Sequence, residues 1–187
     1  HTNVFEFDFG IARSFELWGS SIWALNTRSV EMYEELLAAG FRLTVLGGSD
    51  SHHGYPQRPR RFAPNTYQRA GNYVGTPTTW AFARERTADA VVEAFGNGRV
   101  SISVNPKAPR LEFYADLDGD GMPDLMMGDN VRATGEAVTF IVRVENAGLL
   151  STPLAIDVIR NGEQLQTLFA LPGERELHFT DTPSLDG

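Results

Sequence analysis

The sequence predicts an α/β segment followed by an all-β segment, with the change near residue 106. Residues 28–39 carry apolar side chains at helical spacing, and a short apolar run, 41–46, follows at once. After Pro106, short runs of alternating apolar and polar residues recur between turn residues. Helix followed by strand indicates α/β architecture, whereas repeated alternating runs indicate an antiparallel sheet.

In the first segment we predict a helix over 28–39, because Val30, Tyr33, Leu36 and Leu37 would share one face. Gly40 would end this helix as a C-cap. The strand 41–46 follows, and Gly47-Gly48 would then turn the backbone sharply.

The stretch between His52 and Thr87 is longer than ordinary loops, and it is a candidate lid or substrate wall. Thr87 would cap a helix over 88–95, which Gly96-Asn97-Gly98 would end. A strand over 100–104 follows.

In the second segment the alternating runs predict five strands, over 111–115, 138–144, 154–160, 164–168 and 176–179. Asn161-Gly162 predicts a two-residue hairpin turn, because both positions tolerate a positive φ. Strands of this number and spacing are typical of an immunoglobulin-like β-sandwich, here without the Cys-Trp-Cys signature of antibody domains. We therefore predict domains over 1–105 and 107–187.

The amino-acid composition excludes several classes of function and of metal ligand. The 187-residue chain is 42% apolar and carries a formal charge of −8, so we expect a globular protein that does not bind nucleic acid. It has no cysteine, which excludes disulfides and leaves only His and carboxylate ligands for a transition metal. No apolar run is long enough to span a membrane. Because the chain begins with His1 instead of Met, we expect it to be an internal piece of a longer protein.

Asp50 and His52 form the most informative short motif, an Asp-x-His directly after the strand 41–46. The carboxyl ends of such strands are where α/β proteins gather ligands and catalytic groups. The pair therefore predicts a metal site. In the alternative interpretation, Asp50 caps a turn and the histidines, including His53, are solvated.

Several further blocks follow the same order as in a known family. They are Phe15-Glu16-Leu17-Trp18-Gly19, Gly47-Gly48-Ser49-Asp50-Ser51-His52, Asn72-Tyr73-Val74-Gly75 and Gly98-Arg99-Val100-Ser101-Ile102-Ser103-Val104-Asn105-Pro106. In these blocks the chain resembles the PHP superfamily of metal-dependent hydrolases, and within it the carbamate-hydrolase-like branch. The resemblance covers roughly the first 105 residues. It implies that they are the C-terminal part of a PHP-type (β/α) barrel.

The resemblance also implies a site. Asp50 and His52 would be ligands of a divalent transition metal, Zn, Mn or Fe, in a cluster of two or three ions. His1 precedes Glu16 by fifteen residues, as a ligand His-Pro does in the family, but Thr2 stands in place of Pro. The family's upstream His-x-His is absent here. The parent protein would hydrolyse a phosphoester, or a carbamate or ester, with a metal-activated water, and this fragment alone would be inactive.

The second motif is Asp116-Leu117-Asp118-Gly119-Asp120-Gly121-Met122-Pro123-Asp124. Aspartates at positions 1, 3 and 5, glycine at 6 and an acidic residue at 9 match the first half of a calcium-binding loop. Met127 stands at position 12 in place of the usual Glu, and Asp129 could close the shell instead. We predict Ca²⁺ at Asp116, Asp118, Asp120 and Asp124, with a solvated turn as the alternative.

Two functions remain open from the sequence. The first is a fragment of a metal-dependent hydrolase with a small-molecule substrate, associated with the remainder of its own longer chain. The second is a calcium-stabilised binding or structural module with a degenerate, non-catalytic barrel. Loops of this calcium type suit millimolar calcium, so we expect an extracellular or periplasmic protein. An opened barrel would also expose strand edges, which predicts association between copies or aggregation.

Overall fold

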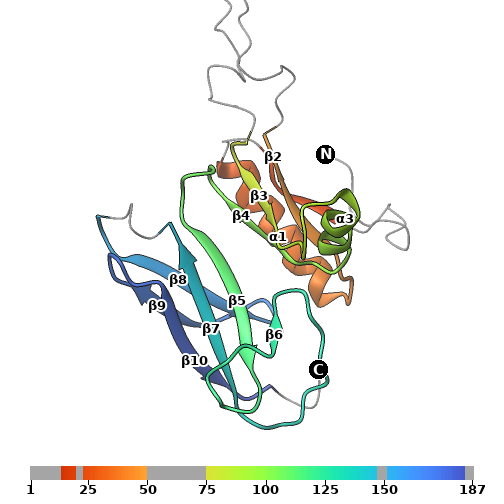
Figure 1. Ribbon diagram of the computed structural model, residues 1–187. Coiled ribbons are helices and arrows are strands. Elements are labelled where there is room, and N and C mark those ends of the chain that lie inside the picture. Colours follow the sequence, from red (N-terminus) through yellow and green to blue (C-terminus); the bar gives the residue numbers. More distant parts are fainter. Residues whose placement is uncertain (1–13, 20–22, 50–74, 147–150, 184–187) are drawn as a thin grey trace, which may run out of the picture. The chain divides into compact units, whose positions relative to one another are not determined.

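A computed structural model describes residues 14–19, 23–49, 75–146 and 151–183 of the chain. Within these residues the chain is mostly β-strand, arranged in four small sheets, with two helices (Figure 1). The elements in order are β1 (Ser14–Gly19), α1 (Trp23–Ala38), β2 (Thr44–Gly48), β3 (Thr78–Ala81), α3 (Ala88–Gly96), β4 (Val100–Ser103), β5 (Arg110–Asp116), β6 (Leu125–Met126), β7 (Val138–Glu145), β8 (Leu154–Arg160), β9 (Glu163–Ala170) and β10 (Glu176–Asp181).

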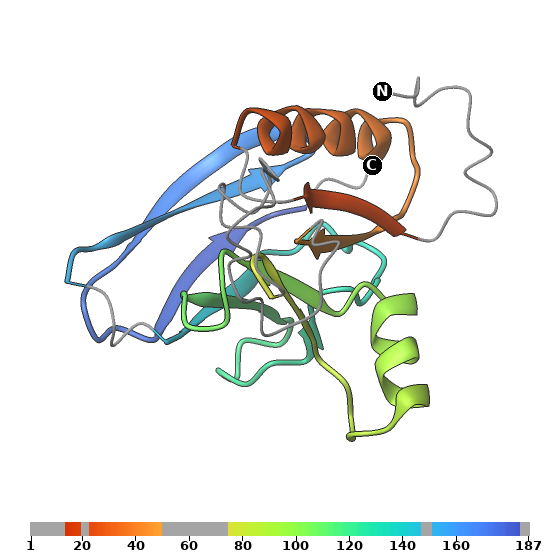
Figure 2. The ribbon, with the colours of Figure 1, turned by 90° about the horizontal axis from the view of Figure 1, so that it is seen from above.

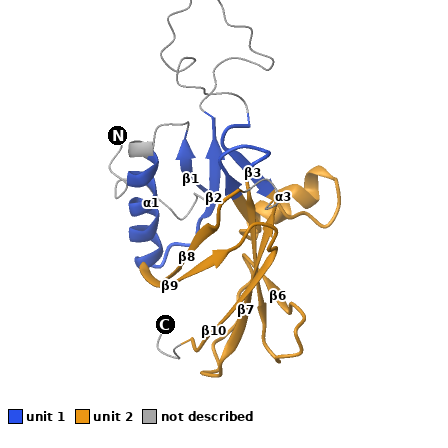
Figure 3. Ribbon diagram, turned by 90° about the vertical axis from the view of Figure 1, so that its left-hand side faces the viewer, with its two compact units in different colours: residues 1–80, 102–108 blue, residues 81–101, 109–187 orange. Residues whose placement is uncertain are grey.

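The chain divides into two compact units (Figure 3). The first contains residues 1–80 and 102–108, and the second contains residues 81–101 and 109–187. The division falls within β3 and β4, which pair as a two-stranded sheet. Neither helix of the described residues is long and apolar enough to cross a membrane.

In the first unit, β1 and β2 pair in parallel and α1 connects them. The register places Glu16 opposite Leu46 and Gly19 opposite Gly48, with an irregularity between Glu16 and Trp18. Because parallel strands need a crossover, the helix covers this strand pair, and Figure 2 shows α1 running beside β1. The carboxyl ends of β1 and β2 therefore lie together.

Helix α1 is attached to the strands by both apolar and polar contacts. The rings of Phe15 and Tyr33 stack at a centroid separation of 5.9 Å, and the Tyr33 hydroxyl donates to the Leu43 carbonyl at 2.9 Å. Burial of the ring raises the pKa of Tyr33. Near the start of the helix, the fully buried Asn26 accepts a hydrogen bond from the backbone N–H of Gly19. This bond connects the helix to the carboxyl end of β1.

In the second unit, β10, β7, β5 and β6 form an antiparallel sheet in that order (Figure 1). Strands β8 and β9 form a separate hairpin. Its turn residues, Asn161 and Gly162, have φ values of 54° and 81°, as a two-residue turn of this type requires. The predicted hairpin is confirmed.

One apolar core joins the sheet to the hairpin. Its buried residues come from four strands and are Val142, Val144, Ile156, Ala170 and Phe179. The rings of Phe113 and Phe140 stack on each other and on Phe179, with centroids 5.0–6.1 Å apart. Burial of these side chains favours the folded unit, since apolar burial is the dominant favourable term in folding.

The strands predicted in the second segment are confirmed, with ends within three residues of those observed. Helix α3 is confirmed as well, and the Thr87 hydroxyl accepts a hydrogen bond from the N–H of Ala90 as its N-cap. Helix α1 begins five residues before the predicted helix. The stretch between His52 and Thr87, which we expected to be a long loop, contains the strand β3. Strands β1 and β6 were not predicted.

Candidate metal centre

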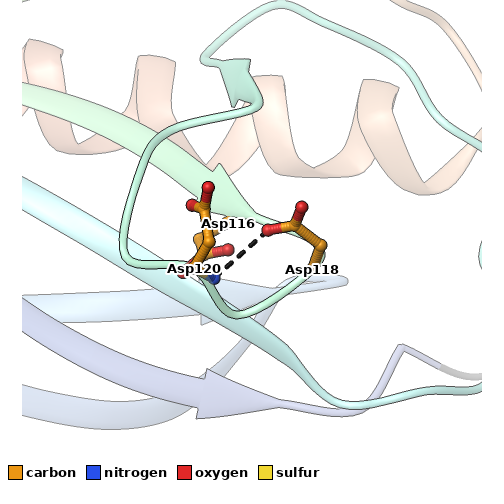
Figure 4. A group of neighbouring side chains, drawn as sticks. All are labelled: Asp116, Asp118 and Asp120. Carbon is orange, nitrogen blue, oxygen red and sulfur yellow. Dashed lines mark hydrogen bonds between the residues drawn. The ribbon is translucent and has the colours of Figure 1, made fainter.

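Three of the four aspartates predicted to bind calcium lie together in the loop between β5 and β6 (Figure 4). Asp116 is the last residue of β5 and is buried, while Asp118 and Asp120 are exposed. One carboxylate oxygen from each of the three lies within 4.8 Å of the others. The strand end therefore fixes one carboxylate, and the turn brings two more to it.

Backbone N–H groups organise the turn. The two oxygens of Asp116 accept hydrogen bonds from the N–H groups of Gly119 and Gly121, at 2.7 and 2.9 Å. Both glycines have positive φ values, 76° and 85°, which other residues rarely adopt. Asp118 accepts from the N–H of Asp120, the bond drawn in Figure 4. The loop thus curls around the Asp116 carboxylate.

Asp124, the fourth predicted ligand, stands outside this group. Its carboxylate accepts a hydrogen bond from the N–H of Leu117 at 2.7 Å, and its own N–H donates to the carbonyl of Ala115 at 2.8 Å. Asp124 therefore closes the loop at its base. In this arrangement it holds the turn in place, and it is not gathered with the other three carboxylates.

Asp129, which the sequence suggested could complete the shell, has other partners. Its carboxylate accepts a hydrogen bond from the N–H of Met126 at 3.1 Å and from the Arg99 guanidinium at 2.7 Å. The N–H of Met126 and the guanidinium together lower the pKa of Asp129. Next to it, Gly128 has a φ of 90°, and a Cβ there would collide with the carbonyl of Asn97. The segment after β6 is thus joined to the end of α3.

The Asp116–Asp120 turn fits a hard cation. Each ionised carboxylate offers about four lone-pair positions, so the N–H bonds leave oxygen lone pairs for an ion. Three carboxylates this close repel one another, and a divalent cation would remove that repulsion. Ca²⁺ takes oxygen ligands in flexible geometry, which agrees with an exposed turn of this kind.

The residues predicted to bind a transition metal, His1, Asp50 and His52, lie outside the described residues. The structure does describe the strand that leads to Asp50. Strand β2 ends at Gly48, directly beside the end of the parallel strand β1. In the sequence, the predicted motif thus follows the carboxyl end of a parallel strand. This strand spans Thr44–Gly48 and includes Gly47 and Gly48, where a sharp turn was predicted.

Two contacts at this strand end were not predicted. The carboxylate of Glu16 lies against Gly48, so a Cβ on that glycine would meet its Oε1. The backbone of Gly47 donates to the Thr79 hydroxyl at 2.8 Å, and that hydroxyl donates to the Gly47 carbonyl at 3.0 Å. Glu16 lies in a block that carries the family resemblance, which could have signalled it. Thr79 had no sequence signal, because it is 32 residues from Gly47.

In comparisons with protein-family models, curated proteins and solved structures, nothing matches this chain.

Proposed function

We propose that the chain is part of a PHP-type metal-dependent hydrolase in which Asp50 and His52 bind a divalent transition metal. The observation that carries the proposal is the parallel pair of β1 and β2 connected by α1. In β/α proteins, groups that follow the carboxyl ends of parallel strands face the ligand. Asp50 comes two residues after the end of β2, so the motif follows the strand end that such chemistry uses.

The surroundings of this strand end support a polar site. The Glu16 carboxylate lies beside Gly48 and is exposed. An acidic group there would favour a cation nearby. His1, which stands in the family's position for a ligand, would be a third protein ligand.

The proposed chemistry is hydrolysis. A divalent metal lowers the pKa of its bound water and polarises a P=O or C=O group. The proposed substrates are therefore phosphoesters, carbamates or esters. Because catalytic sites of this kind need at least three protein ligands, we propose that the remaining ligands lie in the rest of a longer chain. In this proposal β1–β4 belong to the C-terminal part of a (β/α) barrel, and β5–β10 form an immunoglobulin-like sandwich.

Titration of the metal tests the proposal. The chain is stripped with a chelator and titrated with Zn²⁺ and Mn²⁺ by calorimetry, as wild type and as Asp50→Ala and His52→Ala. We expect saturable binding that each substitution weakens by at least tenfold, because a ligand is lost. His178→Ala is the matched control, since this exposed histidine on β10 pairs with Glu176. Binding that survives Asp50→Ala and His52→Ala would refute the assignment.

A second candidate function rests on the aspartate turn. We propose in this case that the chain is a calcium-stabilised binding or structural module of an exported protein, with a non-catalytic first segment. The gathering of Asp116, Asp118 and Asp120 supports it. The two candidates differ in one respect that can be measured: a hydrolase loses its metal on Asp50→Ala, whereas the module keeps its stability and needs only Ca²⁺.

A further inference from the structure

The second unit contains a cavity of about 440 Å³ between one end of its sheet and the segment that connects β6 to β7. Figure 1 shows this segment making a wide excursion before the chain enters β7. The cavity is lined mostly by apolar side chains, of which the most important here are Phe113, Phe140, Leu125, Met126, Met127 and Val131. It lies entirely within one unit.

The cavity reaches the aromatic part of the core. Phe113 and Phe140 stack at 5.4 Å with an interplanar angle of only 7°, and both line the cavity. Although these rings belong to the core of the unit, they are only half-buried. Val131, which also lines the cavity, is 60% exposed. The unit thus leaves apolar surface uncovered that a ligand of matching size would remove from water.

The charged side chains that line the cavity differ in whether they have an ion-pair partner among the described residues. The carboxylate of Asp129 is paired with Arg99. Arg132 also lines the cavity, and among the described residues its guanidinium has no hydrogen bond or ion pair. Glu136, at the same cavity, has a carboxylate without an ion pair in the described part of the chain. A guanidinium presents several donors that fit a carboxylate.

From this combination the geometry points to a binding site for a small aromatic acid. The aromatic body would lie against Phe113 and Phe140, and its carboxylate would pair with Arg132. The volume is within the range of small-molecule sites, roughly 300–1,000 Å³. Met126 and Met127 supply adaptable, polarisable walls that favour contact with an aromatic ring. The lining includes Leu117 of the aspartate turn but none of the three gathered aspartates, Asp116, Asp118 and Asp120.

The probe is 2-naphthoate, titrated into the whole chain labelled with ¹³C at the methionine methyl groups. Met126 and Met127 line the cavity, whereas Met32 lies on α1 and Met122 is 69% exposed in the aspartate turn. The chain has four methionines, so every methyl signal is accounted for. We expect saturable shifts at Met126 and Met127 only. Absence of saturable shifts there would overturn the inference.

Substitutions of the charged residues at the cavity test whether the ligand carboxylate lies at Arg132. Arg132→Gln should weaken 2-naphthoate binding by about tenfold, since an ionic hydrogen bond is lost. Arg175→Gln, at an exposed position that does not line the cavity, should leave it unchanged. Glu136→Gln should tighten binding. A stronger response to 2-naphthylmethylamine than to 2-naphthoate would overturn the carboxylate assignment.

A last control tests whether a side chain of the protein itself, and not a small molecule, occupies the cavity. Pro183 lines the cavity, and Leu185 follows two residues later. If Leu185 occupies the cavity, Leu185→Asp will shift the Met126 and Met127 methyl signals in the ligand-free protein. That result would overturn the small-molecule assignment. Unchanged methyl signals, together with unchanged 2-naphthoate affinity, support it.

Discussion

The hydroxyl of Thr79 on β3 bonds both backbone polar groups of Gly47 on β2, accepting from its N–H at 2.8 Å and donating to its carbonyl at 3.0 Å. One side chain thus substitutes for a neighbouring strand at this position. Gly47 lies three residues before Asp50, so the contact holds the backbone that leads to the predicted metal ligands. A glycine here is also required by packing, since a Cβ would stand 2.9 Å from Ile102.

Removal of the Thr79 hydroxyl should lower the free energy of unfolding. Thr79→Val keeps the shape of the side chain but leaves two backbone groups of Gly47 without their partner. We expect a loss of about 1–3 kcal/mol in the free energy of unfolding. Urea unfolding followed by circular dichroism measures this loss, and Thr79→Ser should restore most of it. An equal loss in both variants would mean that the methyl group matters and the hydroxyl does not.

The two glycines of β2 should respond differently to alanine. At Gly47 the added methyl meets the half-buried Ile102 and the buried Pro77, so we expect a loss of about 1–3 kcal/mol. At Gly48 it meets the flexible, exposed end of Glu16, which can move aside. Thermal unfolding of Gly47→Ala and Gly48→Ala compares them, and Gly48→Ala should cost clearly less. Equal losses would contradict the packing described here.

Calcium should stabilise the protein through the aspartate turn. At a concentration about 100 times its dissociation constant, a bound ion adds roughly 2.7 kcal/mol to the free energy of unfolding. Differential scanning calorimetry with Ca²⁺ and with a chelator measures the shift in melting temperature. Asp118→Asn should abolish most of the shift. Asp89→Asn, in the first turn of α3, is the matched control and should retain it. A shift that persists in Asp118→Asn would place the ion elsewhere.

The pair of Asp129 and Arg99 should make stability depend on pH. The N–H of Met126 and the Arg99 guanidinium lower the pKa of Asp129 in the folded protein. A lowered pKa contributes stability above the pKa of the unfolded chain, and this contribution is lost as the pH falls through the folded value. Asp129→Asn should therefore cost about 1–2 kcal/mol at pH 7 and progressively less in acid. Urea unfolding at several pH values tests this, and a cost independent of pH would contradict it.

Local signals predicted much of the second unit. Thr87 as N-cap and Asn161-Gly162 as a turn act through the backbone of their immediate neighbours, so the sequence is sufficient to locate them. The turn of Asp116, Asp118 and Asp120 was predictable for the same reason, because alternate positions in a tight turn face one centre.

Long-range contacts were not predictable. Strand β3 is four residues long and depends on β4 and on the bonds between Thr79 and Gly47, none of which leaves a local pattern. Asp129 was expected near calcium because of its charge, but Arg99, 30 residues earlier, pairs with it. Pairing across such distances depends on tertiary packing, which short motifs do not record.

The metal content of the purified chain tests the central proposal most directly. Mn, Fe, Zn and Ca are measured by elemental analysis in wild type, Asp50→Ala and His178→Ala, before and after treatment with a chelator. The proposal predicts a near-stoichiometric transition metal in wild type and His178→Ala that is lost in Asp50→Ala. Calcium alone, with no transition metal bound, would contradict the hydrolase site and favour the calcium-stabilised module.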